Sequence, residues 1–518
     1  MTQQNYKLLK YARSTAAACF FVFMMAYLLH NFDPADPDKY TWLTSTQFMP
    51  SLLKIIAAGL AVYAVAGLIL IVLFTFIFGR VYCSLICPLG ILQDIIGFFK
   101  RLCMPWKKHA YKTLPKWLKL RTAIVVVCAG TFLFGLIFPV MLLDPFSFFG
   151  RINTNLFRPA YLAFSNIAAK SELMAEYFGF EKHEYLPFTV SAVIFALSTL
   201  TLLTAAVILY GRIYCNSVCP VGSILGAISK YSLLKVKIDP EKCRSCGICE
   251  NSCKAGCIEY MEHQIDASRC VMCFNCTASC PFDAMTYGKG RTALHKPPVR
   301  NEVNAERREF MTVAGIMTLT LPIMASPLRP PVKTQSKSPV MPPGAGDYRR
   351  FNGKCTSCHL CVSACPSNII KPSLTAYGLT NLMQPQLDYS KNYCKQDCNV
   401  CSLVCPTGAL LPQSNSIKKR LQIGLAEYTK ARCIVITEKT YCGACAEACP
   451  RNAIKMVEYN NFSIPQVDPI YCIGCGACEK TCPARPVKAI RVGGVSQQKI
   501  TPPLKVKKVE EEEDGFPF

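Results

Sequence analysis

The chain contains the stretch Cys270-Val271-Met272-Cys273-Phe274-Asn275-Cys276-Thr277-Ala278-Ser279-Cys280-Pro281, with the spacing C-x2-C-x2-C-x3-C-P. Three thiolates at this close spacing can hold three irons of one [4Fe–4S] cube, while the fourth reaches a second cube. The proline after the fourth cysteine turns the chain away. The stretch therefore predicts a domain of α+β fold that binds two iron–sulfur clusters.

A second run lies just upstream and differs only in having Lys254 where the proline would stand. If each fourth cysteine crosses to the other cube, one cluster takes Cys243, Cys246, Cys249 and Cys280. The other cluster then takes Cys270, Cys273, Cys276 and Cys253. Cys257 is left over, as a spare thiol or as an alternative fourth ligand. We expect this two-cluster domain to cover residues 234–290.

Four more cysteine runs follow in residues 348–493 and predict four further clusters, six in all. Their leading cysteines stand 39 residues apart, and a disulfide framework would not require such repeated local spacing. The sixteen ligands are Cys355, Cys358, Cys361 and Cys365; Cys394, Cys398, Cys401 and Cys405; Cys433, Cys442, Cys445 and Cys449; and Cys472, Cys475, Cys478 and Cys482. The third run is the least regular. Sequential pairing would bring Cys405 to the cluster of Cys355.

Residues 355–359 read Cys-Thr-Ser-Cys-His and formally match a c-type haem attachment sequence. Both thiols are already required by the first run, so the cluster interpretation is preferred. His359 is then expected at the surface or in packing.

Half of the residues are hydrophobic, in long blocks that indicate membrane spans beside soluble modules. Residues 1–233 contain four such blocks, at 14–29, 55–78, 122–143 and 185–210, and predict a helical membrane bundle. Lys and Arg dominate before the first block and between residues 80 and 121, where Asp94 is the sole acidic residue. The positive-inside rule therefore places the N-terminus and the two-cluster domain in the cytoplasm. The net charge of +24 is explained by these flanks rather than by nucleic-acid binding.

The bundle contains an internal repeat of the motif G-R-x-Y-C-x3-C-P-x-G, at residues 79–90 and 211–222. Thiols four residues apart share one helical face, so Cys83, Cys87, Cys215 and Cys219 could bind an extra metal or cluster. They could also act as redox dithiols or as small packing residues. Cys19, Cys103 and Cys128 match no motif and are expected to be structural. His30 is expected to be an interfacial histidine.

Residues 306–328 begin with Glu306-Arg307-Arg308-Glu309-Phe310-Met311 and continue as a short apolar run. The double arginine is typical of a twin-arginine export signal, which carries folded cargo across the inner membrane. Because clusters are inserted in the cytoplasm, we expect this segment to export the following region and to remain as a fifth span. Residues 329–347 form a Pro-rich linker, and the charged tail 494–518 is expected to be disordered.

These motifs resemble two families. Residues up to about 289 resemble the NapH-type membrane ferredoxin of quinol dehydrogenases, which has four spans, two such repeats and a two-cluster domain. Residues from about 306 resemble the NapG or MauM type of periplasmic ferredoxin subunit, with its double arginine and an irregular third run. This chain departs from both by joining them. Similar four-cluster subunits nest their runs, which would bring Cys482 to the first cluster and Cys365 to the last.

The resemblance implies electron transfer from membrane quinol, menaquinol or ubiquinol, through [4Fe–4S] clusters to a periplasmic reductase of the nitrate-reductase kind or to an electron-carrier protein. The chain would then be an electron-transfer subunit, not itself identified as an enzyme. The hydrocarbon layer is ~30 Å thick and the spans lack ligands at mid-depth, so direct transfer between the two cluster regions is not expected. Two alternatives are a membrane ferredoxin that assists metal-centre assembly or regulation, and a cytoplasm-facing subunit of a dehydrogenase or hydrogenase. The sequence identifies neither catalytic residues nor a quinol site.

Overall fold

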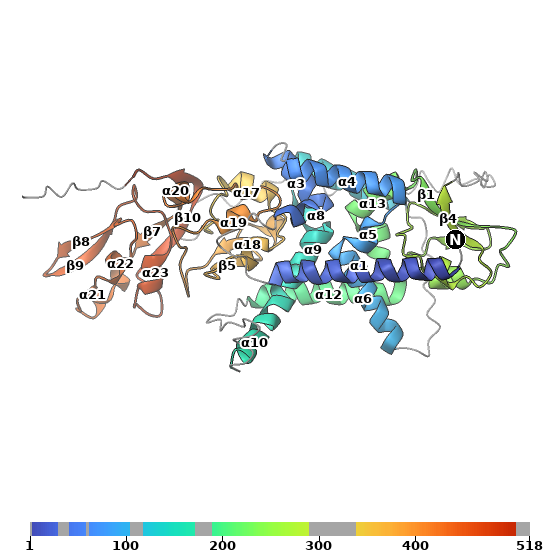
Figure 1. Cartoon of the computed structure of the whole chain (residues 1–518). Helices are drawn as coiled ribbons and strands as arrows, with labels where there is room; N and C mark the ends of the chain where they lie inside the picture. The colour runs from blue at the N-terminus through green and yellow to red at the C-terminus, as the bar shows by residue number, and fades with distance from the viewer. Residues whose placement is uncertain are drawn as a thin grey trace, which may run out of the picture.

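The computed structural model of the chain describes residues 3–29, 41–58, 62–103, 118–170, 189–289 and 338–503. These residues form an elongated molecule (Figure 1). A helical bundle occupies the middle, the two-run region (residues 234–289) lies at one end, and the four-run region (residues 338–503) lies at the other. The expected fifth span at 310–328, the double arginine and His30 lie outside the described residues.

Helix α1 (Gln3–Leu29) runs along the whole bundle and touches both ends. Gln3 donates from Nε2 to the carbonyl of Cys280 in the two-run region, at 2.9 Å. The other end of α1 contacts α18 (Leu360–Ser363) in the four-run region. Because an α-helix rises about 1.5 Å per residue, α1 is about 40 Å long and can cross an apolar layer. The two ends of the molecule are therefore separated by roughly the length of one spanning helix.

Two described helices, α1 and α12 (Val190–Tyr210), are long and apolar enough to cross a membrane. Each corresponds to a predicted span. Of the other two predicted spans, the one at 55–78 contains the end of α3 (Phe48–Ala58) and the shorter apolar helix α4 (Val62–Phe78), with residues 59–61 outside the described part of the chain. The one at 122–143 is broken into α7 (Leu118–Leu133) and α8 (Phe138–Leu143). Gly135, with φ +75°, lies in the turn between α7 and α8, a conformation that glycine adopts readily. The described helices thus support two of the four predicted spans.

The bundle contains further helices and helical turns between these elements along the chain. They are α2 (Thr41–Ser45), α5 (Tyr82–Leu85), α6 (Pro88–Cys103), α9 (Pro145–Ile152), the π-helical turn η2 (Asn153–Phe157), α10 (Arg158–Ala168), the π-helical turn η3 (Tyr214–Val218) and α13 (Pro220–Ser229). Pro88 and Pro220 each begin a helix, because proline lacks the N–H that the first turn cannot use. The proline of each C-x3-C-P motif therefore redirects the chain into a new helix.

The segment that starts at Asp144 begins with a capped helix inside the bundle. The Asp144 carboxylate accepts from the backbone N–H of Ser147 at 2.8 Å and caps α9, with Pro145 in its first turn. Phe146 and Phe149 are fully buried and pack in the same core as the C-x3-C-P cysteines. This segment therefore fills the bundle between the motifs and the four-run region.

The two iron–sulfur regions are built from short helices and two-stranded antiparallel sheets. In the two-run region β1 (Leu234–Ile238) pairs with β4 (Met285–Lys289), and β2 (Ile258–Glu259) with β3 (Gln264–Ile265), around α14 (Ile248–Ser252) and α15 (Asn275–Ser279). In the four-run region the pairs are β5 (Ile370–Ser373) with β6 (Gln384–Leu387), β7 (Leu421–Tyr428) with β10 (Ile490–Ile500), and β8 (Ile454–Tyr459) with β9 (Phe462–Val467). Its helices are α17 (Tyr348–Lys354), α18, η4 (Leu379–Asn381), α19 (Val400–Leu403), α20 (Asn415–Lys418), η5 (Lys430–Arg432), α21 (Ile434–Thr437), α22 (Ala444–Glu447) and α23 (Ala477–Thr481).

Strand β10 extends beyond residue 493, where the disordered tail was expected to begin. Lys499 and Ile500 pair with Gln422 and Leu421 of β7, after an irregularity between Gly494 and Lys499. Thr501 is buried and donates from its backbone to the carbonyl of Arg420. The ordered region therefore continues to residue 503, because β7 offers backbone partners that composition alone does not reveal.

Candidate iron–sulfur and thiol sites

The eight cysteines expected to form the first two sites lie around two small cavities in the two-run region. Cys243, Cys246, Cys249 and Cys280 line one cavity. Cys253, Cys270, Cys273 and Cys276 line the other, together with Cys257. Each fourth cysteine thus lies with the first three cysteines of the other run.

Cys257 is not remote from the second cavity. Its Sγ lies 3.6 Å from Sγ of Cys253, and hydrogen bonding from Cys257 lowers the pKa of the Cys253 thiol to about 7. Thiolates are the form that ligates iron, so this contact favours Cys253 as the ligand and Cys257 as its hydrogen-bonding neighbour.

The four-run region pairs its runs in sequence and not in a nested order. Cys433, Cys442 and Cys445 line a cavity with Cys482, whereas Cys472, Cys475 and Cys478 line another with Cys449. Among the first two runs, burial raises the pKa of the Cys355 thiol, and the neighbouring Cys358 and Cys405 raise it further. Burial also raises the pKa of the Cys365 thiol to about 11, and Cys394 and Cys398 lie near enough to add to it. The first run therefore pairs with the second and the third with the fourth.

This pairing predicts which thiols lose protection when one fourth cysteine is replaced. In Cys482→Ser we expect Cys433, Cys442 and Cys445 to become alkylated by iodoacetamide, because their cluster has lost a ligand. In Cys449→Ser the freed thiols should be Cys472, Cys475 and Cys478 instead. Peptide mass spectrometry of the anaerobically purified chain identifies them. Alkylation of the Cys355 run in Cys482→Ser would support nesting and contradict the pairing.

The backbone around these cavities suits sulfur-rich clusters. Residues between the cysteines adopt left-handed conformations, among them Ser245, Met272, Phe274, Ser357 and His359. This geometry turns backbone N–H groups toward the thiols: Met272 donates to Cys270, Ser357 to Cys355 and Leu360 to Cys358. N–H bonds to sulfur are among the features that tune iron–sulfur clusters. Among the described residues, no group of three His, Cys, Asp or Glu lies at the spacing of a single metal ion.

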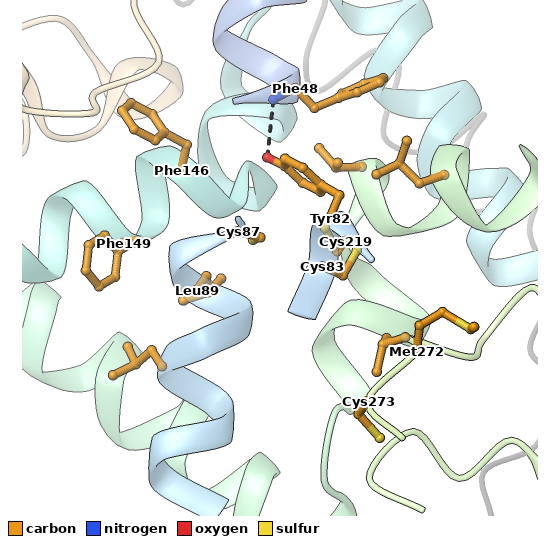
Figure 2. Packing of buried hydrophobic residues seen from close by; sticks show 14 of the residues in the cluster. Phe48, Tyr82, Cys83, Cys87, Leu89, Phe146, Phe149, Cys219, Met272 and Cys273 are labelled. Carbon is orange, nitrogen blue, oxygen red and sulfur yellow. Dashed lines mark hydrogen bonds between the residues drawn. The ribbon is translucent and has the colours of Figure 1, made fainter. Parts of the chain in front are cut away.

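The four C-x3-C-P cysteines are all buried inside the bundle. Figure 2 shows three of them, Cys83, Cys87 and Cys219. Cys83, Cys87 and Cys219 belong to the same apolar core as Phe146 and Phe149. Burial raises the pKa of the Cys219 thiol, and Cys215, Cys87 and Cys83 act on it electrostatically as well. The two copies of the repeat, more than a hundred residues apart in sequence, therefore form one thiol group.

The arginine of each motif copy donates hydrogen bonds to backbone carbonyls of the other copy. Arg212 donates to the carbonyls of Cys83 at 2.8 Å and Gly90 at 3.0 Å. Arg80 donates to the carbonyl of Cys215 at 3.0 Å and lies 3.7 Å from Sγ of Cys83. The two copies are thus joined by reciprocal bonds.

The last glycine of each motif copy is required by the same close packing. A Cβ at Gly90 would stand 2.2 Å from the carbonyl oxygen of Cys83, and one at Gly222 would stand 2.2 Å from that of Cys215. Any side chain at either glycine would therefore push the new helix away from the cysteine loop.

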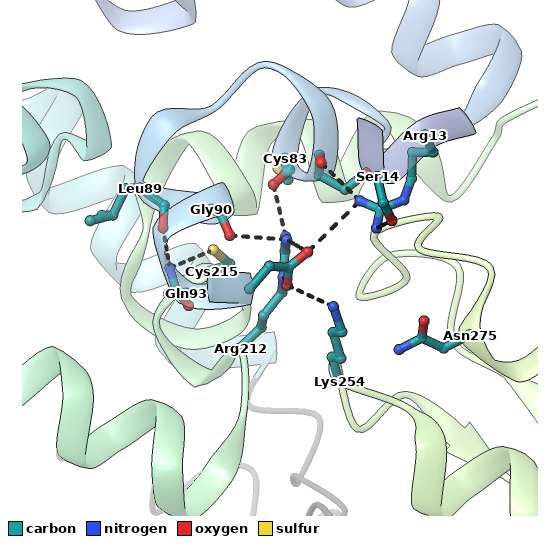
Figure 3. A network of polar contacts seen from close by, with 12 residues as sticks. Arg13, Ser14, Cys83, Leu89, Gly90, Gln93, Arg212, Cys215, Lys254 and Asn275 are labelled. Atoms are coloured by element: carbon teal, nitrogen blue, oxygen red, sulfur yellow. Dashed lines mark hydrogen bonds and ion pairs between the residues drawn. The ribbon is translucent and has the colours of Figure 1, made fainter. Parts of the chain in front are cut away.

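The carboxylate of Asp94 is at the centre of the surrounding polar network. Figure 3 shows the three cations of this network, Arg13, Arg212 and Lys254. Asp94 forms ion pairs with Arg212 at 2.9 Å, Lys254 at 3.2 Å and Arg13 at 3.8 Å. Burial alone would raise the pKa of Asp94, but these cations, Arg212 first, hold it below its usual value. Asp94 therefore remains charged and joins α1, α6, the second motif copy and the two-run region.

Further bonds join the thiol group to the two-run region. Asn216 donates to the carbonyl of Ala255 at 2.9 Å, and the backbone N–H of Arg212 donates to the carbonyl of Lys254 at 2.9 Å. Lys254 and Ala255 directly follow Cys253. The second motif copy is therefore hydrogen-bonded directly to the two residues that follow Cys253 at the second cavity.

On its other side the thiol group is connected to the four-run region through α9. The Tyr214 hydroxyl donates to the carbonyl of Leu143 at 2.7 Å, and its ring lies 5.6 Å from that of Phe148. Gly150, also on α9, packs directly against the carbonyl of Cys358. Helix α9 thus lies between the thiols and the first run of the four-run region.

His359 is buried at this junction. Burial lowers its pKa to about 3, so the ring is neutral. Its Nε2–H donates to the carbonyl of Met383 at 2.8 Å, which leaves Nδ1 to accept from the Asn155 amide at 3.0 Å. Nδ1 thus joins the four-run region to the bundle, whereas Nε2 is bonded within the four-run region, so His359 is a packing residue, which is one of the two roles expected for it.

Replacing Gly150 with alanine should detach this junction. A Cβ there would lie 2.3 Å from the Cys358 oxygen, which is backbone and cannot move aside. We expect Gly150→Ala to make the four-run region more sensitive to limited proteolysis at its junction with the bundle. Gly130→Ala on α7 is the matched control, because a Cβ there meets nothing within 4 Å. Equal proteolysis of both variants would contradict the contact.

Sequence reasoning missed the segment from Asp144 to Asn155 and the role of Asp94. The signals were present as Asp144-Pro145, a helix-start pair, and as the lone acidic residue of a basic stretch. Of the cysteines that match no motif, Cys128 is buried, while Cys19 and Cys103 are exposed.

Comparisons with known families agree with these sites. Residues 60–103 and 192–240, which contain both C-x3-C-P copies, match a 4Fe-4S binding domain, and residues 240–256 match another model of that description. Residues 354–410 and 440–485 each match a 4Fe-4S dicluster domain. The first of these matches contains the first and second runs, and the other contains most of the third run and all of the fourth.

Among curated proteins, the chain is similar to the methylamine utilization ferredoxin-type protein MauM of Methylophilus methylotrophus, 32% identical over 156 residues, 27% of this chain and 64% of the relative. It is also similar to MauN of Paracoccus denitrificans, 23% identical over 37% of this chain and 54% of the relative. The ferredoxin-type protein NapF of Escherichia coli is 27% identical over 22% of this chain and 82% of the relative. The chain thus spans less than two thirds of the length of MauM and MauN. No solved structure matches. The chain is an iron–sulfur protein with several 4Fe-4S domains, related to the ferredoxin-type proteins MauM, MauN and NapF.

Proposed function

We propose that the chain carries electrons from membrane quinol through six [4Fe–4S] clusters to a periplasmic reductase or carrier protein. Each cluster, when bound, takes up and releases one electron. The observation that carries the proposal is the arrangement in Figure 1, with the two iron–sulfur regions at opposite ends of one apolar helical bundle. Because α1 contacts both regions with its two ends, a bundle lying in a membrane would hold them on opposite sides.

We also propose that the four C-x3-C-P cysteines supply an electron-transfer site between the two regions. The sequence showed no ligands within the spans, so direct transfer was not expected. The buried thiol group changes this expectation, because the residues on either side of Cys215 contact both directions: Asn216 donates to Ala255 of the two-run region, and Tyr214 packs against Phe148 of α9. Helix α9 in turn meets the four-run region at Gly150. Because electron tunnelling weakens steeply with distance, a site between the two ends would allow transfer through the bundle.

The charges around the thiols favour an anionic centre there. Arg80 is fully buried, and its partners within the described chain are Asn216, the carbonyls of Ser268 and Cys215, and the Cys83 sulfur. None of these is a carboxylate, and Asp94 already has three cations. A buried cation without a counter-charge is strongly disfavoured. Thiolates bound in an iron–sulfur centre would supply that charge, and the 4Fe-4S binding match over both copies favours this over neutral dithiols.

Two measurements on bacterial inner membranes test the function. A periplasm-dependent reporter fused after Pro503 should be active, because the four-run region is expected outside. Menaquinol or ubiquinol should reduce the clusters, and electron paramagnetic resonance at low temperature measures this reduction. Reporter activity restricted to the cytoplasm would favour a cytoplasm-facing subunit, and clusters that quinol leaves oxidised would favour a role in metal-centre assembly.

A further inference from the structure

A cavity of about 840 Å³ lies where α7 and α13 meet the two-run region. Its size is within the range of sites for small organic molecules, about 300–1,000 Å³. Apolar side chains of the two helices form one wall: Leu118, Val125, Ile224 and Ile228. Polar groups lie opposite, on the two-run region: Glu259, Gln264, Asp266 and Ser268. The cavity therefore suits an amphiphile with a long apolar part and a small polar ring.

The cavity shares a lining residue with the second cysteine group. Ile265 lines this cavity and also the one formed by Cys253, Cys270, Cys273 and Cys276. Asp266 lines the large cavity too, and its carbonyl accepts from the backbone N–H of Cys270 at 3.1 Å. A redox-active ring bound here would lie beside the wall of the cluster site.

Arg121 provides a buried donor at the floor of the cavity. Its guanidinium contacts Ser268 at 3.2 Å through Nη1, and it is only 3% exposed. Its Nε–H has no hydrogen-bond partner within the described chain. Buried donors are seldom left unpaired, so the free N–H points to a bound acceptor. Gly226 makes room for this arginine, because a Cβ there would lie 2.2 Å from Nη2.

We propose that this cavity binds the quinol ring, with Arg121 donating to a ring oxygen and the isoprenoid tail lying along α7 and α13. The proposal rests on the proposed function and locates its electron donor. Oxidation breaks the two O–H bonds of the quinol and forms two carbonyls. The two electrons pass singly to the iron–sulfur clusters of the adjoining region. The two protons pass to water, with Glu259 at the cavity wall as an acceptor on the way.

Photolabelling tests the location without requiring turnover. The full chain, purified with its clusters in detergent, is illuminated with an azido-quinone, and the labelled peptides are identified by mass spectrometry. We expect label on α7 and α13, with decyl-ubiquinone in excess preventing it. Label confined to other helices would overturn the proposal.

Ala227→Trp keeps the test independent of Arg121. Ala227 is exposed and lines the cavity, so tryptophan should fill the cavity and abolish labelling without disturbing the core. Ala129→Trp, at an exposed position of α7 that does not line the cavity, should leave labelling unchanged. Equal labelling of both variants would overturn the proposal.

Arg121→Gln tests the proposed donor. Loss of a hydrogen bond from a charged group should weaken quinone binding roughly 10- to 100-fold. Unchanged affinity would exclude Arg121 as the donor. Labelling prevented by phosphatidylglycerol but not by decyl-ubiquinone would make the cavity a lipid site and overturn the proposal.

The outcomes separate this inference from the proposed function. If quinol reduces the clusters equally in the Ala227→Trp and wild-type chains, the function stands and the site lies elsewhere. If the cavity is labelled but quinol leaves the clusters oxidised, the site stands and the function fails.

Discussion

Replacing Cys83 and Cys215 together with alanine should stop electrons from reaching the four-run region. The physical reason is distance: without a site between the two ends, the transfer would have to cross the bundle in one step. We expect quinol still to reduce the clusters of the two-run region, whereas those of the four-run region stay oxidised. Time-resolved electron paramagnetic resonance of rapidly frozen membranes distinguishes the two sets.

Cys128→Ala is the matched control, because Cys128 is also a buried cysteine of the bundle but belongs to neither motif copy. It should transfer electrons at the wild-type rate. Iron analysis should show that both variants retain the clusters of the two outer regions. Wild-type reduction of the four-run region in the double variant would eliminate the C-x3-C-P cysteines as an electron-transfer site.

Replacing Asp94 with asparagine should strongly destabilise the contact between the bundle and the two-run region. The change leaves Arg212, which is about 1% exposed, without its carboxylate partner. Removing one member of a buried ion pair typically costs about 3–5 kcal/mol. We expect a lower midpoint of thermal unfolding and easier proteolysis near Lys254.

Asp388→Asn provides the control. Asp388 pairs with Lys371 at a partly exposed position of the four-run region. Exposed ion pairs contribute only about 0–1 kcal/mol, so this variant should unfold almost as the wild type does. If the two substitutions lower stability equally, Asp94 does not act as a buried structural anion.

The pH dependence of the Asp94 network has a definite sign. The cations lower the pKa of Asp94 in the folded chain, so its stabilisation is present above the pKa of the unfolded chain. This stabilisation is lost only as the pH falls through the lower pKa that Asp94 has in the folded chain. Between pH 5 and 8 the difference in free energy of unfolding between the wild-type and Asp94→Asn chains should therefore stay constant.

The cysteine spacing alone predicted much of the candidate sites. It grouped Cys243, Cys246 and Cys249 with Cys280 and identified four more runs, because cluster ligands within one run are close in sequence. Hydropathy was less reliable. It predicted α1 and α12 well, but it merged α7 with α8, since the break at Gly135 lies within an apolar block.

What the sequence determined by itself was therefore local: cysteine runs with cluster spacing, apolar helices, and a repeated C-x3-C-P motif. Tertiary structure decided which runs share ligands, that Asp144 begins a buried helix, and that the two motif copies meet. The physical reason is that these features depend on contacts between distant residues, such as Arg212 with Cys83 and Gly150 with Cys358. Such contacts follow from packing and leave no periodic signal in the chain.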